Sequence, residues 1–256
     1  MQDLKITLVQ ANQVWEDKKE NYTNYSSLLR SVETDLIVLP EMFNTAFSMN
    51  VDELAEDWQD SSAIKWLKDL SKAKNAAVFT SLIIKDNNKF HNRGVFIVPT
   101  GEINYYDKRK SFGLANEDRL FTAGKNEVIV SYKNWKINLQ ICYDLRFPEL
   151  IRNRIEDEVA AYDLLLYVAN WPEKRINHWD ALLLSRAIEN QCYVVGVNRV
   201  GRDFNGLDYC GHSKLIGPLG EVDQLTSGKE ISKTVVIVKS SLNSTRNKLP
   251  FLKDRT

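Results

Sequence analysis

The stretch Lys136-Ile-Asn-Leu-Gln-Ile-Cys142 alternates polar and apolar residues, as a strand does, and ends in a cysteine. The segment Tyr143-Asp-Leu-Arg-Phe-Pro-Glu149, which follows directly, is polar and suited to a turn. Two further strand-like segments also end at chemically useful groups: Leu36-Ile-Val-Leu-Pro40 precedes Glu41, and an extended segment leads into Tyr105-Tyr-Asp-Lys108. A thiol, a carboxylate and an amine at three strand ends predict an active site.

Other segments outward from this stretch alternate between strand-like and helical patterns. Strands are predicted at Leu4–Gln10, Leu36–Pro40, Ala77–Ile84, Gly94–Val98, Ile137–Cys142, Leu164–Val168, Tyr193–Asn198, Ser213–Ile216 and Lys233–Val238. Three sets of residues spaced by three or four predict buried helix faces: Tyr22, Tyr25, Leu28, Leu29 and Val32; Ile64, Leu67 and Leu70; Ala181, Leu184, Ala187 and Ile188. Turn residues at Asp86–Lys89 and Pro99–Glu102 add hairpins, so the pattern predicts an α/β layered fold with a mixed sheet.

Length and charge narrow the class of protein. The 256 residues suit one α/β domain. Thirty-four basic and 34 acidic residues give no net charge to attract nucleic acid or an anionic membrane, so a small or neutral partner is expected. The longest apolar runs, such as Leu164–Ala169, are far shorter than the roughly 20 residues that span a bilayer. The first ten residues have the pattern of a strand rather than a signal peptide, which favours a cytoplasmic protein.

The three cysteines, Cys142, Cys192 and Cys210, form no C-x-x-C pair, which argues against a disulfide framework and a cysteine metal site. The chain also lacks H-E-x-x-H, a P-loop and G-x-G-x-x-G, so no metal or other cofactor is expected. The three histidines, His91, His178 and His212, show no pairing that would support a Cys-His dyad, and they are assigned structural roles.

A cysteine that ends an apolar strand is more often buried structure than chemistry, and this interpretation suits Cys192 and Cys210. Cys142 differs because Pro148-Glu149 predicts a helix close behind it, whose amino terminus would stabilise a thiolate. Such a strand-to-helix corner would also direct the backbone N–H of Tyr143 at a developing oxyanion.

Three segments resemble the signatures of the nitrilase superfamily, the carbon-nitrogen hydrolases. They are Leu-Pro-Glu41 with the following Met-Phe, Tyr106-Asp-Lys108, and Gln140-Ile-Cys142-Tyr-Asp-Leu-Arg-Phe-Pro-Glu149. Further segments resemble its bacterial omega-amidase branch: Tyr167–Pro172, His178-Trp179, Ser185–Gln191 and Asn198–Gly201. One departure is Lys110, where many relatives carry histidine.

The resemblance implies a four-layer α-β-β-α sandwich of two mixed sheets flanked by helices over residues 1–239. Residues 240–256 lack a periodic pattern and are expected to form an extended tail that frays or docks on the partner subunit of a homodimer. The resemblance makes Glu41 the general base, Lys108 the cation that stabilises the oxyanion and Cys142 the nucleophile. It also implies a supporting carboxylate at Glu117, seven positions before the glycine of Thr122-Ala-Gly124.

The implied activity is hydrolysis of the terminal amide of 2-oxoglutaramate, 2-oxosuccinamate or succinamate to the acid and ammonia, through a cysteine thioester. Alternatives are a nitrilase or N-carbamoyl amidohydrolase with the same triad, and a catalytically silent scaffold. A distal substrate carboxylate would need a cation, for which Arg146 and Arg175 are the candidates, although each could instead form a structural ion pair. Trp171 is a candidate pocket wall, with a core position as its alternative.

Overall fold

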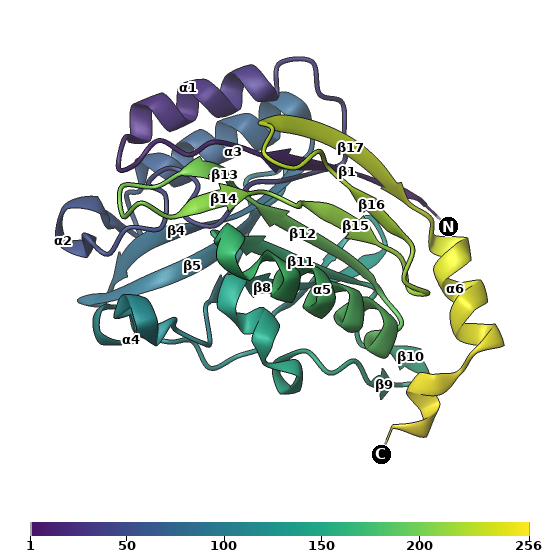
Figure 1. Cartoon of the computed structure of the whole chain (residues 1–256). Coiled ribbons are helices and arrows are strands. Elements are labelled where there is room, and N and C mark those ends of the chain that lie inside the picture. Colours follow the sequence, from purple (N-terminus) through teal and green to yellow (C-terminus); the bar gives the residue numbers. More distant parts are fainter. Residues whose placement is uncertain (1, 256) are drawn as a thin grey trace.

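Two stacked β-sheets form the centre of the protein, and helices cover their outer faces (Figure 1). The structure is a computed structural model that describes residues 2–255. The expected four-layer α/β sandwich is therefore observed.

The first sheet has seven strands, and both parallel and antiparallel pairs occur in it. In spatial order it contains β17 (Ile231–Ile237), β1 (Leu4–Gln10), β2 (Leu36–Val38), β4 (Ala77–Asp86), β5 (Lys89–Ile97) and β6 (Ile103–Asp107), with β3 (Glu56–Asp57) also paired to β4.

The second sheet has six strands and is also mixed. In order it contains β16 (Val222–Gln224), β15 (Lys214–Ile216), β12 (Tyr193–Asn198), β11 (Leu164–Ala169), β8 (Trp135–Ile141) and β7 (Ile129–Tyr132). Two short ribbons lie outside the sheets: β13 (Val200–Arg202) with β14 (Asp208–Cys210), and β9 (Ile155–Glu156) with β10 (Val159–Ala160).

Helices α1 and α3 lie on the outer face of the first sheet, and α5 lies on the second (Figure 1). The α-helices are α1 (Lys18–Leu28), α2 (Val51–Leu54), α3 (Ser62–Lys74), α4 (Glu117–Leu120), α5 (Ile176–Asn190) and α6 (Lys239–Lys248). The 3-10 turns are η1 (Gly113–Ala115), η2 (Cys142–Arg146), η3 (Pro148–Leu150), η4 (Glu173–Arg175) and η5 (Phe251–Asp254). Within residues 2–255, no helix is both long enough and apolar enough to cross a membrane.

Alternation along the strands builds two apolar layers at once. On β2, Leu36 and Val38 face the layer between the sheets, whereas Ile37 packs against the helices that cover the first sheet. Because both of its faces are buried, β2 is continuously apolar and shows no polar side. The predicted hairpin turns are also observed, between β4 and β5 and between β5 and β6.

The predicted apolar face of α5 is correct only at Ala187. Ile188 is 49% exposed, and the buried residues of this helix are Trp179, Leu183, Arg186, Ala187 and Asn190. Leu183 packs so closely on β12 that a Cβ at Gly196 would lie 2.5 Å from its Cδ1 atom. Apolar residues occupy most of the circumference of α5, so spacing alone did not identify the buried side.

The homodimer stays a prediction.

The prediction of an extended tail is also wrong, because residues 239–248 form α6 and residues 251–254 form η5. Both elements dock on the protein's own core through the buried side chains of Leu242 and Leu252. Arg246 Nη1 donates to Asp163 Oδ1 at 2.8 Å, and Lys239 also pairs with Asp163. Buried Leu242 and Leu252, the ion pairs with Asp163 and hydrogen bonds to Tyr162 and Gln191 hold this segment, so its sequence shows no apolar period.

Candidate active site

Strand ends from both sheets meet at one place. Glu41 and Lys108 follow β2 and β6 of the first sheet, while Cys142 and Asn170 follow β8 and β11 of the second. Asn170 joins the sheets: its backbone N–H donates to Glu41 Oε2 at 2.9 Å, and its Nδ2 donates to the Glu41 carbonyl at 2.7 Å. The carboxyl ends of strands in the two sheets thus bring together groups that are far apart in the chain.

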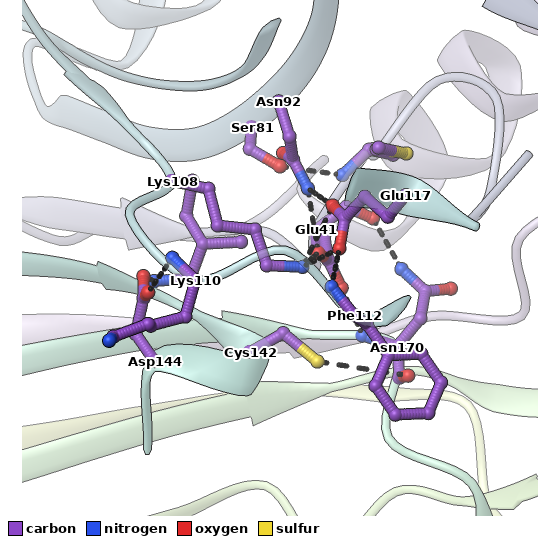
Figure 2. A network of polar contacts seen from close by, with 12 residues as sticks. Glu41, Ser81, Asn92, Lys108, Lys110, Phe112, Glu117, Cys142, Asp144 and Asn170 are labelled. Atoms are coloured by element: carbon purple, nitrogen blue, oxygen red, sulfur yellow. Dashed lines mark hydrogen bonds and ion pairs between the residues drawn. The ribbon is translucent and has the colours of Figure 1, made fainter. Parts of the chain in front are cut away.

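Lys108 lies between two carboxylates. Its Nζ atom donates to Glu41 Oε1 at 2.9 Å, to Glu117 Oε1 at 3.0 Å and to Glu117 Oε2 at 2.9 Å. Figure 2 shows the Lys108 ammonium pointing at both carboxylates. Both glutamates are fully buried, and Lys108 is 3% exposed. The structure therefore brings together three of the residues that the sequence predicted.

Electrostatics keep the Lys108 ammonium charged. Burial alone lowers the pKa of this lysine, but the carboxylates of Glu117 and Glu41 outweigh burial and raise it above its ordinary value. Two carboxylates and one ammonium leave this buried cluster with one net negative charge. One of the two carboxylates can therefore accept a proton from a neighbouring group.

Cys142 occupies a strained corner between β8 and η2. Its φ angle of +43° lies in the left-handed region, which a residue with a side chain rarely adopts. The Sγ atom lies 3.9 Å from the carbonyl oxygen of Asn170 (Figure 2). The Tyr143 N–H belongs to the first turn of η2, where N–H groups have no partner within the helix.

The predicted helix behind Cys142 is wrong, because only the 3-10 turns η2 and η3 follow it. The expected stabilisation of a thiolate is wrong as well. Burial raises the pKa of the Cys142 thiol well above its ordinary value, and the Glu41 carboxylate raises it further, while Lys108 opposes both. The resting cysteine is therefore a protonated thiol that needs a base.

Two residues that contact this cluster were missed by the sequence reasoning, Asn92 and Asn170. Asp144, which lies beside it, was missed as well. Asn92 Nδ2 donates to Glu41 Oε1 at 2.8 Å and to Glu117 Oε1 at 3.1 Å. The signal available in the sequence was a polar residue placed within, or directly after, a strand that is buried on both faces.

Asp144 joins the cysteine corner to the loop that carries Lys108. Its Oδ2 atom accepts from the Ile141 N–H at 3.0 Å and from the Tyr106 hydroxyl at 2.8 Å, and its Oδ1 accepts from the Lys110 N–H at 2.9 Å. Burial raises the pKa of this fully buried carboxyl to about 6, although Lys108 and these donors oppose the shift.

Asp144 predicts a pH dependence of stability. Its pKa is about 6 in the fold but about 3.9 in an unfolded chain, so ionisation destabilises the fold as the pH rises through this window. The stability of the wild type relative to Asp144→Asn is expected to fall by up to about 1.4 kcal/mol per pH unit between about pH 4 and 6. Urea unfolding of both proteins at several pH values measures this difference. A difference that does not vary with pH would contradict the prediction.

A cavity of about 580 Å³ opens in front of Cys142. Six of the residues singled out from the sequence line it: Lys108, Cys142, Tyr143, Arg146, Trp171 and Arg175. Glu41 and Glu117 do not line the cavity. Both carboxylates accept hydrogen bonds from Lys108, which does line it. Every acceptor position of Glu117 is taken, because Oε1 accepts from Asn92 and Lys108 while Oε2 accepts from Lys108 and, at 2.6 Å, from the Phe112 N–H.

Aromatic side chains hold the two candidate arginines at the cavity. The Arg146 guanidinium carbon lies 4.7 Å from the centre of the Trp171 ring, and that of Arg175 lies 5.4 Å from the Phe112 ring. Arg146 Nη2 also lies 3.2 Å from His178 Nδ1, so this histidine, assigned a structural role, touches a cavity residue. Neither arginine has a carboxylate partner among the described salt bridges. Within residues 2–255, no group of three or more His, Cys, Asp and Glu side chains could hold a metal ion.

Comparison with known proteins gives consistent similarities. The family model for carbon-nitrogen hydrolases matches residues 5–247. The chain is 41% identical to omega-amidase YafV of Yersinia enterocolitica, over 99% of this chain and 97% of that protein. It is 34% identical to 2-oxoglutaramate amidase of Bacillus subtilis (strain 168), over 75% of this chain and 73% of that protein.

One solved structure resembles the chain along its whole length. A CN-hydrolase superfamily protein from Xanthomonas campestris, described with an arsenic adduct in the active site, superposes with a TM-score of 0.97. It is 38% identical and covers 100% of this chain and 98% of its own.

Proposed function

Because this chain belongs to the carbon-nitrogen hydrolase family and is an amidase-type hydrolase, we propose that it releases ammonia from the terminal amide of a short dicarboxylic or 2-oxo acid monoamide. The substrate class follows relatives that are named omega-amidase and 2-oxoglutaramate amidase. One observation supports its transfer to this chain: the cavity that contains the Cys142 thiol also contains the guanidinium groups of Arg146 and Arg175. These substrates include 2-oxoglutaramate, 2-oxosuccinamate and succinamate.

The reaction begins with proton transfer from Cys142 to Glu41. The raised pKa of the thiol requires a base, and the Glu41 carboxylate is near enough to influence that pKa. As the proton leaves, the sulfur attacks the amide carbon and forms a C–S bond. The carbonyl oxygen becomes an oxyanion, which faces the Lys108 ammonium and the Tyr143 N–H.

The tetrahedral intermediate then collapses. Its C–N bond breaks as Glu41 returns the proton to the leaving nitrogen, so ammonia departs and a thioester remains on Cys142. Water, deprotonated by Glu41, attacks the thioester carbon through a second oxyanion. The C–S bond breaks, the sulfur regains a proton, and the acid is released.

Glu117 acts in this scheme by holding Lys108. Its buried carboxylate has no free acceptor position, whereas Glu41 Oε2 accepts one described hydrogen bond, so Glu117 positions the cation rather than touching substrate or water. The family resemblance implies a supporting carboxylate at Glu117, and these contacts favour an indirect form of that support.

Arg146 and Arg175 would bind the distal carboxylate, since guanidinium groups pair with carboxylates through two hydrogen bonds. Stacking on Trp171 leaves the edge of the Arg146 guanidinium available for that contact while fixing its plane. Trp171 is itself fixed, because its Nε1 donates to the Arg175 carbonyl at 2.8 Å. We propose Trp171 as an apolar wall between the two cations.

A matched pair of amides tests the proposal. Succinamate and butyramide have chains of equal length, but only succinamate carries a distal carboxylate. Ammonia release is expected to have a kcat/KM at least about tenfold higher for succinamate, since one charge-assisted hydrogen bond is worth about 1.5–3 kcal/mol. In Arg146→Gln or Arg175→Gln, the preference should fall for whichever arginine binds that carboxylate.

The same assay separates the alternatives. Turnover of a nitrile or an N-carbamoyl amino acid in preference to both amides would replace the amidase proposal. No turnover of any of these compounds, with no acyl adduct on Cys142 by intact mass, would indicate a silent scaffold.

A further inference from the structure

We propose that Asn92 is a positioning residue of this site, whose side-chain amide selects the oxygen of Glu41 that receives the thiol proton. The proposal rests on the proposed function, because it assumes that Glu41 is the base for Cys142. Asn92 lies within β5 and is 2% exposed, so it does not reach the cavity.

Asn92 contacts all three members of the buried cluster. Its Nδ2 atom donates to Glu41 at 2.8 Å and to Glu117 at 3.1 Å, while its backbone carbonyl oxygen accepts from the backbone N–H of Lys108 at 3.0 Å. Figure 2 shows the amide directed between the two carboxylates. The three partners come from the end of β2, the start of α4 and the end of β6, so one strand residue sets their relative positions.

The contacts of Glu41 show how Asn92 orients the two oxygen atoms of this carboxylate. Its Oε1 atom is held by Asn92 Nδ2 and Lys108 Nζ, whereas Oε2 accepts only the Asn170 N–H among the described hydrogen bonds. The Asn170 carbonyl is also the contact of Cys142 Sγ. By holding Oε1, Asn92 leaves an acceptor position of Oε2 open, next to the Asn170 backbone that also contacts the thiol.

An uncharged donor suits this position. Glu41, Glu117 and Lys108 together carry one net negative charge, which Glu41 needs in order to accept a proton. A lysine or arginine in place of Asn92 would neutralise that charge, whereas the amide orients both carboxylates and leaves the charge unchanged. An aspartate would place a third buried carboxylate beside the other two.

The direct test is Asn92→Ala, assayed by amide hydrolysis across pH. Loss of one hydrogen bond to a charged group predicts that kcat falls by about 10- to 100-fold, with KM changed by less than about threefold. The charged form of Glu41 loses a hydrogen-bond donor, so the acid limb of the activity profile is expected to move to higher pH. The groups that face Glu41, and remain in the variant, are Lys108, Glu117 and Cys142.

Asn92→Asp provides an isosteric comparison, in which the donor is replaced by an acceptor. Its loss of kcat should exceed that of Asn92→Ala, because like charges then face one another. The control for a buried amide is Asn190→Ala, at the end of α5. Asn190 is fully buried and bonds to Arg186 and Asn153, outside the cluster and the cavity. This control should lose stability without any displacement of the pH profile.

A second readout separates this proposal from the proposed function. Alkylation of Cys142 by iodoacetamide, followed by intact mass, reports assistance by Glu41 without requiring amide turnover. The acid limb of the alkylation rate, plotted against pH, should move to higher pH in Asn92→Ala and remain in place in Asn190→Ala. A limb that stays in place in Asn92→Ala would overturn the role of Asn92, even if the variant were less stable. If the wild type hydrolyses none of the amides, but the acid limb of alkylation still moves in Asn92→Ala, the proposed amide substrate would be rejected. The positioning role of Asn92 would stand.

Discussion

Cys142→Ala is expected to lose amide hydrolysis by on the order of 10⁶-fold in kcat, the scale seen when a nucleophile is removed from a coupled catalytic set. Without the sulfur no thioester can form, and Glu41 and Lys108 have no intermediate to act on. The fold should persist, because the change removes one atom from a residue that is 9% exposed. Ammonia release measures the loss, and urea unfolding measures stability.

Cys192→Ala is the matched control. Cys192 is fully buried, and its Sγ atom lies 4.0 Å from the Arg186 carbonyl oxygen, outside the cavity lining. This variant should retain its kcat, and its intact mass after mixing with substrate should still show an acyl adduct. Ammonia release that survives in Cys142→Ala would contradict the thioester mechanism.

Lys108→Met is expected to reduce both activity and stability. The oxyanion loses its cation, which predicts about a 10²- to 10³-fold fall in kcat. The buried carboxylates of Glu41 and Glu117 lose the ammonium between them, and breaking a buried ion pair in this way costs about 3–5 kcal/mol of the free energy of unfolding. Methionine fills similar space, so a cavity does not account for the loss.

The pH dependence of this deficit identifies its cause. In Lys108→Met the two facing carboxylates bind a proton more readily when folded than when unfolded, so the stability of the variant rises relative to the wild type as the pH falls from 8 to 5. Urea unfolding over this range measures the deficit. A deficit that stays constant with pH would show that packing, rather than charge, is responsible.

Lys110→Met is the control for the loss of a lysine in the same loop. Lys110 is partly exposed, and its Nζ atom lies 4.0 Å from Glu149. Exposed pairs of this kind contribute about 0–1 kcal/mol, so this variant should unfold within about 1 kcal/mol of the wild type at every pH.

The positions of nine strands, the hairpins and the strand ends that carry Glu41, Lys108 and Cys142 could be predicted from sequence, but the order of strands in the sheets was not predicted. These features depend on alternation and turn chemistry within a few neighbouring residues, and the structure reproduces them with end points that differ by a few residues. The family resemblance then supplied the fold, and the comparisons confirm the family.

The predictions for α5 and for the tail were wrong because contacts between distant segments determine both structures. Which side of α5 is buried depends on the close approach of Leu183 to Gly196. The helical tail depends on Asp163, which receives Lys239 and Arg246 from 76 and 83 positions away. No local period records such pairs.

The sequence by itself determined that a thiol, a carboxylate and an amine end three strands of one α/β domain, because a strand's period and its boundaries are written locally. Only the tertiary structure decided the state of those groups. Burial raises the pKa of Cys142, and the amides of Asn92 and Asn170 hold the Glu41 carboxylate in place. Desolvation and hydrogen-bond geometry arise only when the two sheets pack, so neither can be read from the order of residues along the chain.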